Sequence, residues 1–194
     1  ILQGAGISDL GPKALAKSKI IEEKIGKASQ KFLIIGDVKY PLGRGGEEVP
    51  DTIIDEVQQN LIDLEWILKD MMLEENIMLI GEAGVGKNTL ERYIGHLLNN
   101  NILIAGMSGE TKVSDLQTYR SYGQIEPGKT GDSEVLVLRA STDTEKDWMV
   151  VLDEANKAQP GILVCLNDFL QDKFLRLPNG KQLAITAKIF VNMN

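Results

Sequence analysis

From residue 77 onward, short runs of apolar residues alternate with longer stretches whose apolar residues recur every three or four positions. The short runs are typical of buried strands, and the longer stretches are typical of helices that bury one face. The expected elements are strands at 77–80, 101–105, 148–152 and 188–193, helices at 87–99, 113–119 and 160–171, and a β-hairpin over 175–185 that turns at Pro178-Asn179-Gly180. Strands separated by helices predict an α/β fold with a largely parallel sheet.

The pattern in the first part of the chain predicts two helices on either side of a short strand. Apolar residues at helical spacing indicate a helix from Pro12 to about Lys27, and a second helix over 53–71. Between them, the apolar run 32–35 predicts a strand that enters a glycine-rich loop. We therefore expect a flanking helical segment over residues 1–31 and a core domain over residues 32–194.

The composition of the 194 residues excludes several classes of protein. No apolar run approaches the roughly 18–20 residues that a membrane-spanning helix needs. The formal net charge of −7 argues against direct nucleic-acid binding, which uses a basic surface. One cysteine, Cys165, and one histidine, His96, leave no internal disulfide and no Cys/His metal cluster. We expect an intracellular protein. The cytoplasm is the first expectation for its location, and the mitochondrion and the nucleus are alternatives.

A glycine-rich segment lies between the expected strand 77–80 and the helix that follows it. Its sequence, Gly81-Glu82-Ala83-Gly84-Val85-Gly86-Lys87, fits the G-x-x-x-x-G-K pattern of a phosphate-binding loop. Glycines let the backbone wrap closely around phosphates, and the N-terminus of the next helix adds a partial positive charge. Lys87 would supply a cation to the β- and γ-phosphates of ATP, and the expected ligands are ATP and ADP. The alternative is an ordinary glycine-rich turn between a strand and a helix.

The residue after Lys87 departs from the usual pattern. Where such loops carry a Ser or Thr hydroxyl that holds Mg²⁺, this chain has Asn88, followed by Thr89. An amide oxygen is a hard ligand that can reach a hydrated Mg²⁺, but this ion tolerates little geometric error. Nucleotide binding should survive the substitution better than hydrolysis. The candidate nucleotide-binding residues are Gly81, Glu82, Ala83, Gly84, Val85, Gly86, Lys87, Asn88 and Thr89, of which Asn88 is also a candidate Mg²⁺ ligand.

Two acids follow the expected strand 148–152, and two amides lie at the end of the expected strand 188–193. Strand 148–152 ends in Asp153 and Glu154, which suits Asp153 to bind Mg²⁺ and Glu154 to polarise an attacking water. Ligands of open α/β sheets bind at the carboxyl ends of the strands, so this placement agrees with that of the glycine-rich loop. Asn194 would orient the water near the γ-phosphate, and Asn192, on the same strand face, is a competing candidate.

Together these features resemble the AAA+ ATPases of the dynein-related group, which includes midasin and the MoxR-type ATPases. The resemblance covers roughly residues 32–194. It is carried by the glycine-rich loop and by the segments 153–158, 166–172 and 175–180. The sequence Gly84-Val85-Gly86-Lys87-Asn88 is most similar to the corresponding loop in the AAA+ modules of ATPases that carry a von Willebrand factor A domain. The resemblance implies a P-loop NTPase core of three α/β/α layers.

The resemblance also assigns roles to particular residues. It implies Walker A over 81–87, Walker B at Asp153 and Glu154, sensor 1 at Asn194, and the hairpin of this group over 175–185. Val49 and Pro50 would lie where family members contact the adenine. Family members continue with an arginine finger, a helical lid and a second sensor, so we expect this chain to be a core truncated before the lid.

Three functions remain open from the sequence. The first is an ATP-hydrolysing module of a larger ring, with neighbouring AAA+ modules and a remodelled protein substrate as partners. The second is a degenerate module of such a ring, which binds nucleotide or supports the ring without hydrolysis. Glu154 favours the first, and Asn88 favours the second. A small-molecule kinase is the third, weakened because the sequence shows no lid and no cluster of substrate-binding arginines.

Overall fold

The computed structural model describes residues 18–26, 28–52, 58–112, 136–176 and 182–194. At its centre is a four-stranded parallel sheet in the order β4–β9–β6–β5. These strands are β4 (Ile77–Ile80), β5 (Asn101–Gly106), β6 (Trp148–Asp153) and β9 (Lys188–Met193). Ile80 pairs with Met193, and Gly106 pairs with Asp153, so the carboxyl ends of the strands lie along one edge of the sheet. The expected α/β fold with a parallel sheet is confirmed.

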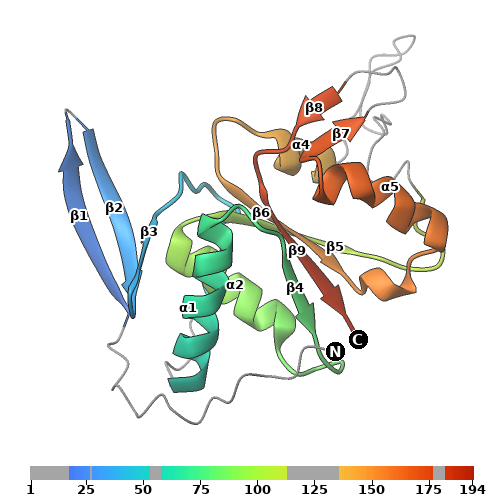
Figure 1. The fold of residues 1–194 in the computed structure, drawn as a ribbon, viewed down its shortest axis with the longest axis horizontal. Coiled ribbons are helices and arrows are strands. Elements are labelled where there is room, and N and C mark those ends of the chain that lie inside the picture. The colour runs from blue at the N-terminus through green and yellow to red at the C-terminus, as the bar shows by residue number, and fades with distance from the viewer. Residues whose placement is uncertain (1–17, 27, 53–57, 113–135, 177–181) are drawn as a thin grey trace.

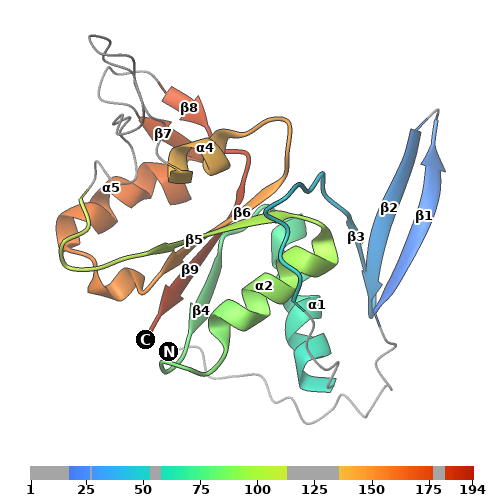
Figure 2. The same cartoon turned by 180° about the vertical axis from the view of Figure 1, so that it is seen from behind.

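Helices cover both faces of this sheet (Figures 1 and 2). One face carries α1 (Gln58–Met72) and α2 (Lys87–Leu98), and the other carries α4 (Leu136–Thr142) and α5 (Pro160–Leu170). Along β6, Met149 and Val151 pack on the α1 and α2 side, whereas Val150 and Leu152 pack on the α4 and α5 side. Burial from both sides explains why the central strands are continuous apolar runs rather than alternating ones. The core therefore has the three expected α/β/α layers.

A second, antiparallel sheet precedes the core, and its outer hairpin stands away from the central sheet (Figure 1). Its strands, in order, are β1 (Lys19–Ile25), β2 (Ala28–Ile35) and β3 (Val38–Pro41). Leu33 and Ile35 of β2 are buried in the cluster that also contains residues of α1 and α2, so this sheet is anchored at one end. The expected boundary at residue 31 falls within β2, and the division into two domains stays a prediction.

The helix expected from Pro12 to Lys27 is wrong over residues 19–25, which form β1, while residues 1–17 lie outside the described ranges. Ile21 and Ile25 have helical spacing, but Gly26 takes a left-handed φ of +63° at the reversal of the chain. Every residue of β1 then pairs with β2. Most of β1 is exposed, so cross-strand pairing rather than an apolar face determines its structure. Local periodicity does not contain that information.

Most of the remaining elements agree with the expected ones wherever the structure describes them, but β3 lies where a loop was expected, and α4 was not among the expected elements. The hairpin is formed by β7 (Phe174–Arg176) and β8 (Gln182–Ala184), which pair antiparallel. Its expected turn and the expected helix 113–119 lie outside the described ranges. A single 3₁₀ turn, η2 (Ala155–Lys157), follows β6. None of the helices in the described ranges combines the length and the apolar character needed to cross a membrane.

Candidate functional site

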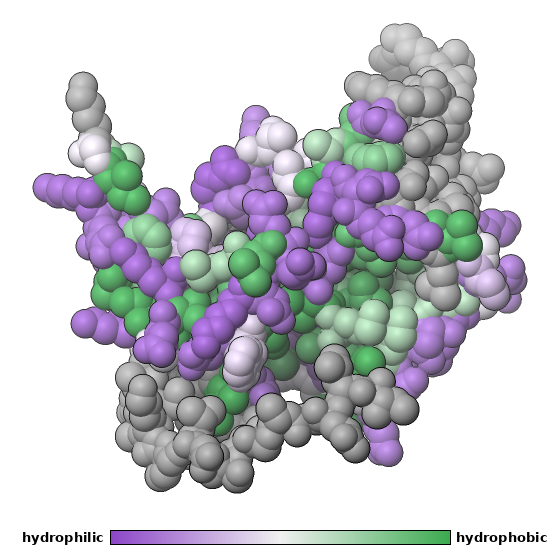
Figure 3. Space-filling view, in the orientation of Figure 1, coloured by the Kyte–Doolittle hydropathy of each residue, from purple (hydrophilic) through white to green (hydrophobic). Residues whose placement is uncertain are grey.

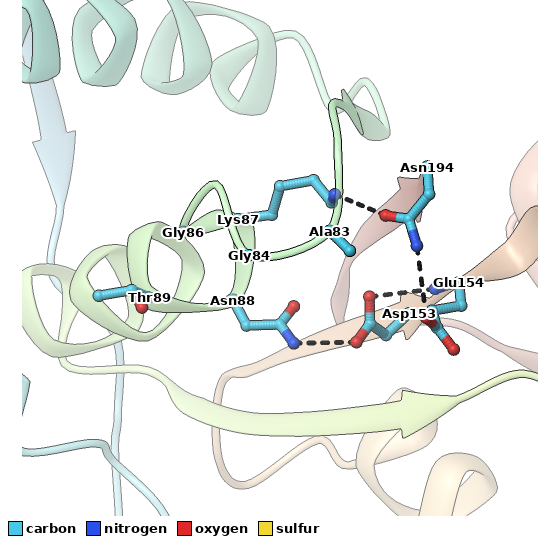
Figure 4. Close-up of a pocket in the computed structure, with 9 residues that line it drawn as sticks. All are labelled: Ala83, Gly84, Gly86, Lys87, Asn88, Thr89, Asp153, Glu154 and Asn194. Atoms are coloured by element: carbon cyan, nitrogen blue, oxygen red, sulfur yellow. Dashed lines mark hydrogen bonds between the residues drawn. The ribbon is translucent and has the colours of Figure 1, made fainter.

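The carboxyl ends of β4, β6 and β9 surround an open cavity of about 340 Å³ (Figure 4). Its lining comes from the loop after β4, the first turn of α2 and the residues that end β6 and β9. The lining residues are Ala83, Gly84, Gly86, Lys87, Asn88, Thr89, Asp153, Glu154 and Asn194. All nine are candidates named from the sequence. The fold brings these nine to one place because parallel strands end at the same edge of the sheet.

The loop over residues 81–86 owes its shape to two glycines. Gly84 and Gly86 have φ values of +82° and +94°, in the left-handed region that residues with a Cβ rarely adopt. A Cβ built on either residue meets nothing within 4 Å, so backbone conformation, not space, requires glycine there. Gly86 is the N-cap of α2, whose first turn lines the cavity. The backbone N–H groups at the start of α2 have no partner within the helix, and this helix end carries a partial positive charge. Both features suit the cavity to an anion.

The side chain of Lys87 folds back over this loop. Its Nζ donates to the carbonyl oxygen of Gly81 at 2.5 Å and to that of Glu82 at 2.9 Å. It also donates to Asn194 Oδ1 at 2.7 Å (Figure 4). The ammonium group therefore lies between the loop and the end of β9, at the wall of the cavity.

Asn194 links Lys87 to Glu154. While its Oδ1 accepts from Lys87, its Nδ2 donates to Glu154 Oε1 at 3.3 Å (Figure 4). The same Glu154 oxygen accepts from Lys157 Nζ at 2.5 Å. Glu154 itself has a left-handed φ of 56°, which turns the chain from β6 into η2. A cation, an amide and a carboxylate thus lie in sequence along one wall of the cavity.

Asn88 turns its amide toward the end of β6. Its Nδ2 donates to Asp153 Oδ2 at 2.9 Å, and its Oδ1 accepts from Asn192 Nδ2 at 2.8 Å. Turning the amide round would place its oxygen against the carboxylate and its NH₂ against another NH₂. The two neighbours therefore determine which way the Asn88 amide faces. The Thr89 side chain points away from Asp153 in the same view (Figure 4).

These contacts bear on whether the site fits Mg²⁺. Asp153 offers carboxylate oxygens, which are the ligands that Mg²⁺ prefers. Asn88, however, presents hydrogens to that carboxylate and gives its oxygen to Asn192. In this orientation Asn88 does not fit as a ligand of an ion bound at Asp153, in disagreement with the expectation from the sequence. Across the described ranges, no group of three or more His, Cys, Asp or Glu side chains is arranged to hold a metal ion.

Asn192 of β9 and Asn194, directly after the strand, occupy different environments. Asn194 is exposed and lines the cavity, whereas Asn192 is fully buried and does not line it. Asn192 contacts the polar side chains beneath the cavity instead. Of the two candidates for orienting a water, the structure therefore places Asn194 at the cavity.

Glu91 was not among the candidates from the sequence. It lies on α2, its side chain is completely buried, and its Oε2 accepts from Asn192 Nδ2 at 3.1 Å. Burial, and secondarily the Asp153 carboxylate, raise the pKa of Glu91 to about 7, against the lowering effect of the Asn192 hydrogen bond. A signal was present in the sequence: Glu91 lies three residues after Asn88, on the helix face that meets the strand ends.

The expected adenine contact at Val49 and Pro50 is not brought to this cavity. Neither residue lines it, and the carbonyl oxygen of Pro50 lies 2.9 Å from His96 Nδ1, in the last turn of α2. A Cβ added to Gly95 would meet the Pro50 ring at 3.2 Å, so the loop packs closely on this end of the helix. Lys87 begins α2 at the opposite end.

The family model of the AAA domain, dynein-related subfamily, matches residues 76–192, which is more than half of the chain and extends from the start of β4 into β9. The chain belongs to this family. The match contains the glycine-rich loop, Asp153 and Glu154. The expected resemblance to dynein-related AAA+ ATPases is thereby confirmed.

Known proteins agree with this family assignment. The AAA module is 27% identical over 161 residues to mouse (Mus musculus) von Willebrand factor A domain-containing protein 8. The aligned region covers 80% of this chain and 8% of the relative. It is 31% identical over 111 residues to an ATP-dependent protease ATP-binding subunit-like protein of Rhodococcus erythropolis, covering 55% of this chain and 32% of the relative. A solved structure of a proposed ATPase from Cytophaga hutchinsonii superposes with a TM-score of 0.54 at 15% identity, covering 69% of this chain and 38% of that one. This last likeness concerns the fold. The chain thus spans less than a third of the curated relatives' lengths.

Proposed function

We propose that this AAA module binds ATP and ADP in the cavity at the carboxyl edge of the sheet. The observation that carries the proposal is the convergence of Lys87, the glycine-rich loop and the start of α2 on one open cavity of about 340 Å³. The backbone N–H groups of the loop would hold the phosphates, and the Lys87 ammonium would neutralise part of their charge. The family assignment of residues 76–192 supports the same ligand class.

We further propose that the module hydrolyses ATP, with Glu154 as the group that takes a proton from the attacking water. Glu154 lines the cavity with the phosphate-binding groups, and a carboxylate at hydrogen-bond reach of a water can act as a general base. Asn194, which contacts both Lys87 and Glu154, is placed to orient that water near the terminal phosphate. Each of these roles is performed by side chains of this chain.

A second candidate function is nucleotide binding without hydrolysis, within the same kind of assembly. The observation that favours it is the Asn88 amide, whose NH₂ group occupies one oxygen of Asp153. A carboxylate engaged in this way is less available to an ion. The two functions share the phosphate-binding loop and differ only in turnover.

We propose that the module works in a larger ring of AAA modules that remodels a protein partner. By the family resemblance, an arginine of a neighbouring module would complete the catalytic site. The name of the Rhodococcus erythropolis relative, an ATP-dependent protease ATP-binding subunit-like protein, fits action on a protein substrate. Comparing ATPase rates below and above the concentration at which modules associate would test the contribution of a neighbour.

Nucleotide binding is tested by replacing Lys87 with alanine. Loss of a charge-assisted hydrogen bond to phosphate, worth about 1.5–3 kcal/mol, should raise the Kd for ATP about 10- to 150-fold. The measurement is a titration with a fluorescent ATP analogue. The matched control is Lys31→Ala, which removes an exposed lysine of β2, far from the cavity, and should leave the Kd unchanged. Equal affinity of wild type and Lys87→Ala would rule out the phosphate-binding role of the loop.

A further inference from the structure

A row of polar side chains leads from the cavity into the interior between α2 and β9. Asn88 lies at the cavity, Asn192 lies beneath it, and Glu91 lies deepest, the last two with no exposed surface. Hydrogen bonds of 2.8 Å and 3.1 Å join Asn192 Nδ2 to Asn88 Oδ1 and to Glu91 Oε2. The row ends at a carboxylate that no other part of the proposed reaction uses.

Hydrogen-bond capacity shows which member of this row determines the orientation of the others. Asn192 Nδ2 carries two hydrogens but faces three acceptors, since Asp153 Oδ1 also lies 3.3 Å away. Asn192 Oδ1 and Glu91 Oε1 are both buried without a hydrogen-bond partner in the structure. Acceptors are therefore in excess, and the amide hydrogens of Asn192 must face them.

Glu91 removes the alternative orientation. An Asn192 amide turned round would bring its own oxygen against the ionised Glu91 carboxylate, which is unfavourable in a buried place. With Asn192 Nδ2 directed toward the cavity, the Asn88 oxygen accepts from it, and the Asn88 NH₂ faces Asp153. The orientation of the Asn88 amide therefore depends on that of Asn192, which in turn depends on Glu91.

We propose that Glu91 is a positioning residue that, through Asn192, keeps the Asn88 amide turned so that its NH₂ covers Asp153 and its oxygen is withheld from Mg²⁺. This inference rests on the proposed binding of nucleotide at the cavity. It explains the disagreement between the expected Mg²⁺ ligand and the observed orientation of Asn88. The predicted property is a nucleotide affinity that depends little on Mg²⁺ in the wild type.

The first test uses Asn88, which lines the cavity and belongs to neither apolar cluster of the core. The quantity measured is the ratio of the Kd for a fluorescent ATP analogue in EDTA to that in Mg²⁺, at about pH 8, where Glu91, with its pKa of about 7, is ionised. Replacing Asn88 with alanine uncovers Asp153, so the ratio should rise about tenfold or more, on the scale of changes next to a metal ligand. If Asn88 were itself a ligand, the ratio would fall instead. A fall, or no change, overturns the proposal.

The second test concerns Glu91. Glu91→Met keeps an unbranched side chain but removes the Glu91 acceptor. When Mg²⁺ neutralises Asp153, Asn192 and Asn88 can then both turn round, so the ratio should rise as in Asn88→Ala. The control is Glu145→Gln, which neutralises an exposed acid away from the cavity and should keep the ratio of the wild type. A purely structural role would weaken binding equally in EDTA and in Mg²⁺.

The outcomes separate the two proposals. A wild-type chain that binds no nucleotide in either buffer refutes the proposed function. A wild type that binds nucleotide, combined with equal ratios in Glu91→Met and wild type, refutes the role of Glu91 alone. If Glu91→Met does not fold, the sign of the change in Asn88→Ala still decides whether the Asn88 amide excludes the ion.

Discussion

Replacing Glu154 with glutamine is expected to leave ATP bound and to lower turnover by a factor of about 10²–10⁴, the usual effect of removing a general base. Glutamine keeps the size of the side chain and can still accept the Asn194 and Lys157 hydrogen bonds through its oxygen. It cannot take a proton from water. The measurement is steady-state phosphate release by the assembled protein, together with the Kd for the ATP analogue.

The control for this experiment is Glu145→Gln, which neutralises an exposed acid near the amino end of β6, away from the cavity. It should change neither turnover nor Kd. Unchanged turnover in Glu154→Gln would remove Glu154 from the reaction, and absence of turnover in the wild type would favour the non-hydrolysing function.

The second large effect is on stability, and it comes from the buried Glu91. Its pKa is about 7 in the folded chain against an ordinary value of 4.5, so between these values the folded state binds more protons than the unfolded state. Stability therefore falls as pH rises through this range and levels off above it. A shift of this size corresponds to a loss of up to about 3 kcal/mol in the free energy of unfolding.

Glu91→Gln isolates this effect, because glutamine stays neutral at every pH. The difference in unfolding free energy between the variant and the wild type should grow in favour of the variant from pH 4.5 to pH 7. Urea unfolding at several pH values measures it, with exposed Glu47→Gln as the control. The groups that act on Glu91 are Asp153 on β6, Asn192 on β9, and Lys87 and Arg92 on α2. A difference that is constant with pH would contradict the buried, protonated acid.

The sequence predicted the central sheet well, because its strands are buried from both sides. A strand such as β6, whose first five residues are buried, needs no partner information to be recognised as a short apolar run. The same argument failed for β1, where exposed residues pair with β2 and the apolar spacing also fits a helix. Strands that are determined by burial could be predicted from the sequence, whereas a strand determined by cross-strand pairing, such as β1, could not.

The candidate site shows a similar division. The residues around the cavity were predictable, because the glycine-rich loop and the acids follow parallel strands that end at one edge. The direction of the Asn88 amide was not predictable, because it depends on Asn192, more than a hundred residues away in the chain. The position of Pro50 against His96 is likewise a long-range contact that no local pattern contains.

The ammonium group of Lys87 has three hydrogens, and two carbonyl oxygens and the Asn194 side chain accept from it. An incoming phosphate must therefore compete with one of these acceptors. If the phosphate displaces Asn194, the Asn194 oxygen loses its hydrogen bond to Lys87. The amide is then less well oriented, and its hydrogen bond to Glu154 weakens when the phosphate binds. The exchange of one hydrogen bond at Lys87 would then couple phosphate binding at the loop to the position of the Glu154 carboxylate, with no movement of the backbone.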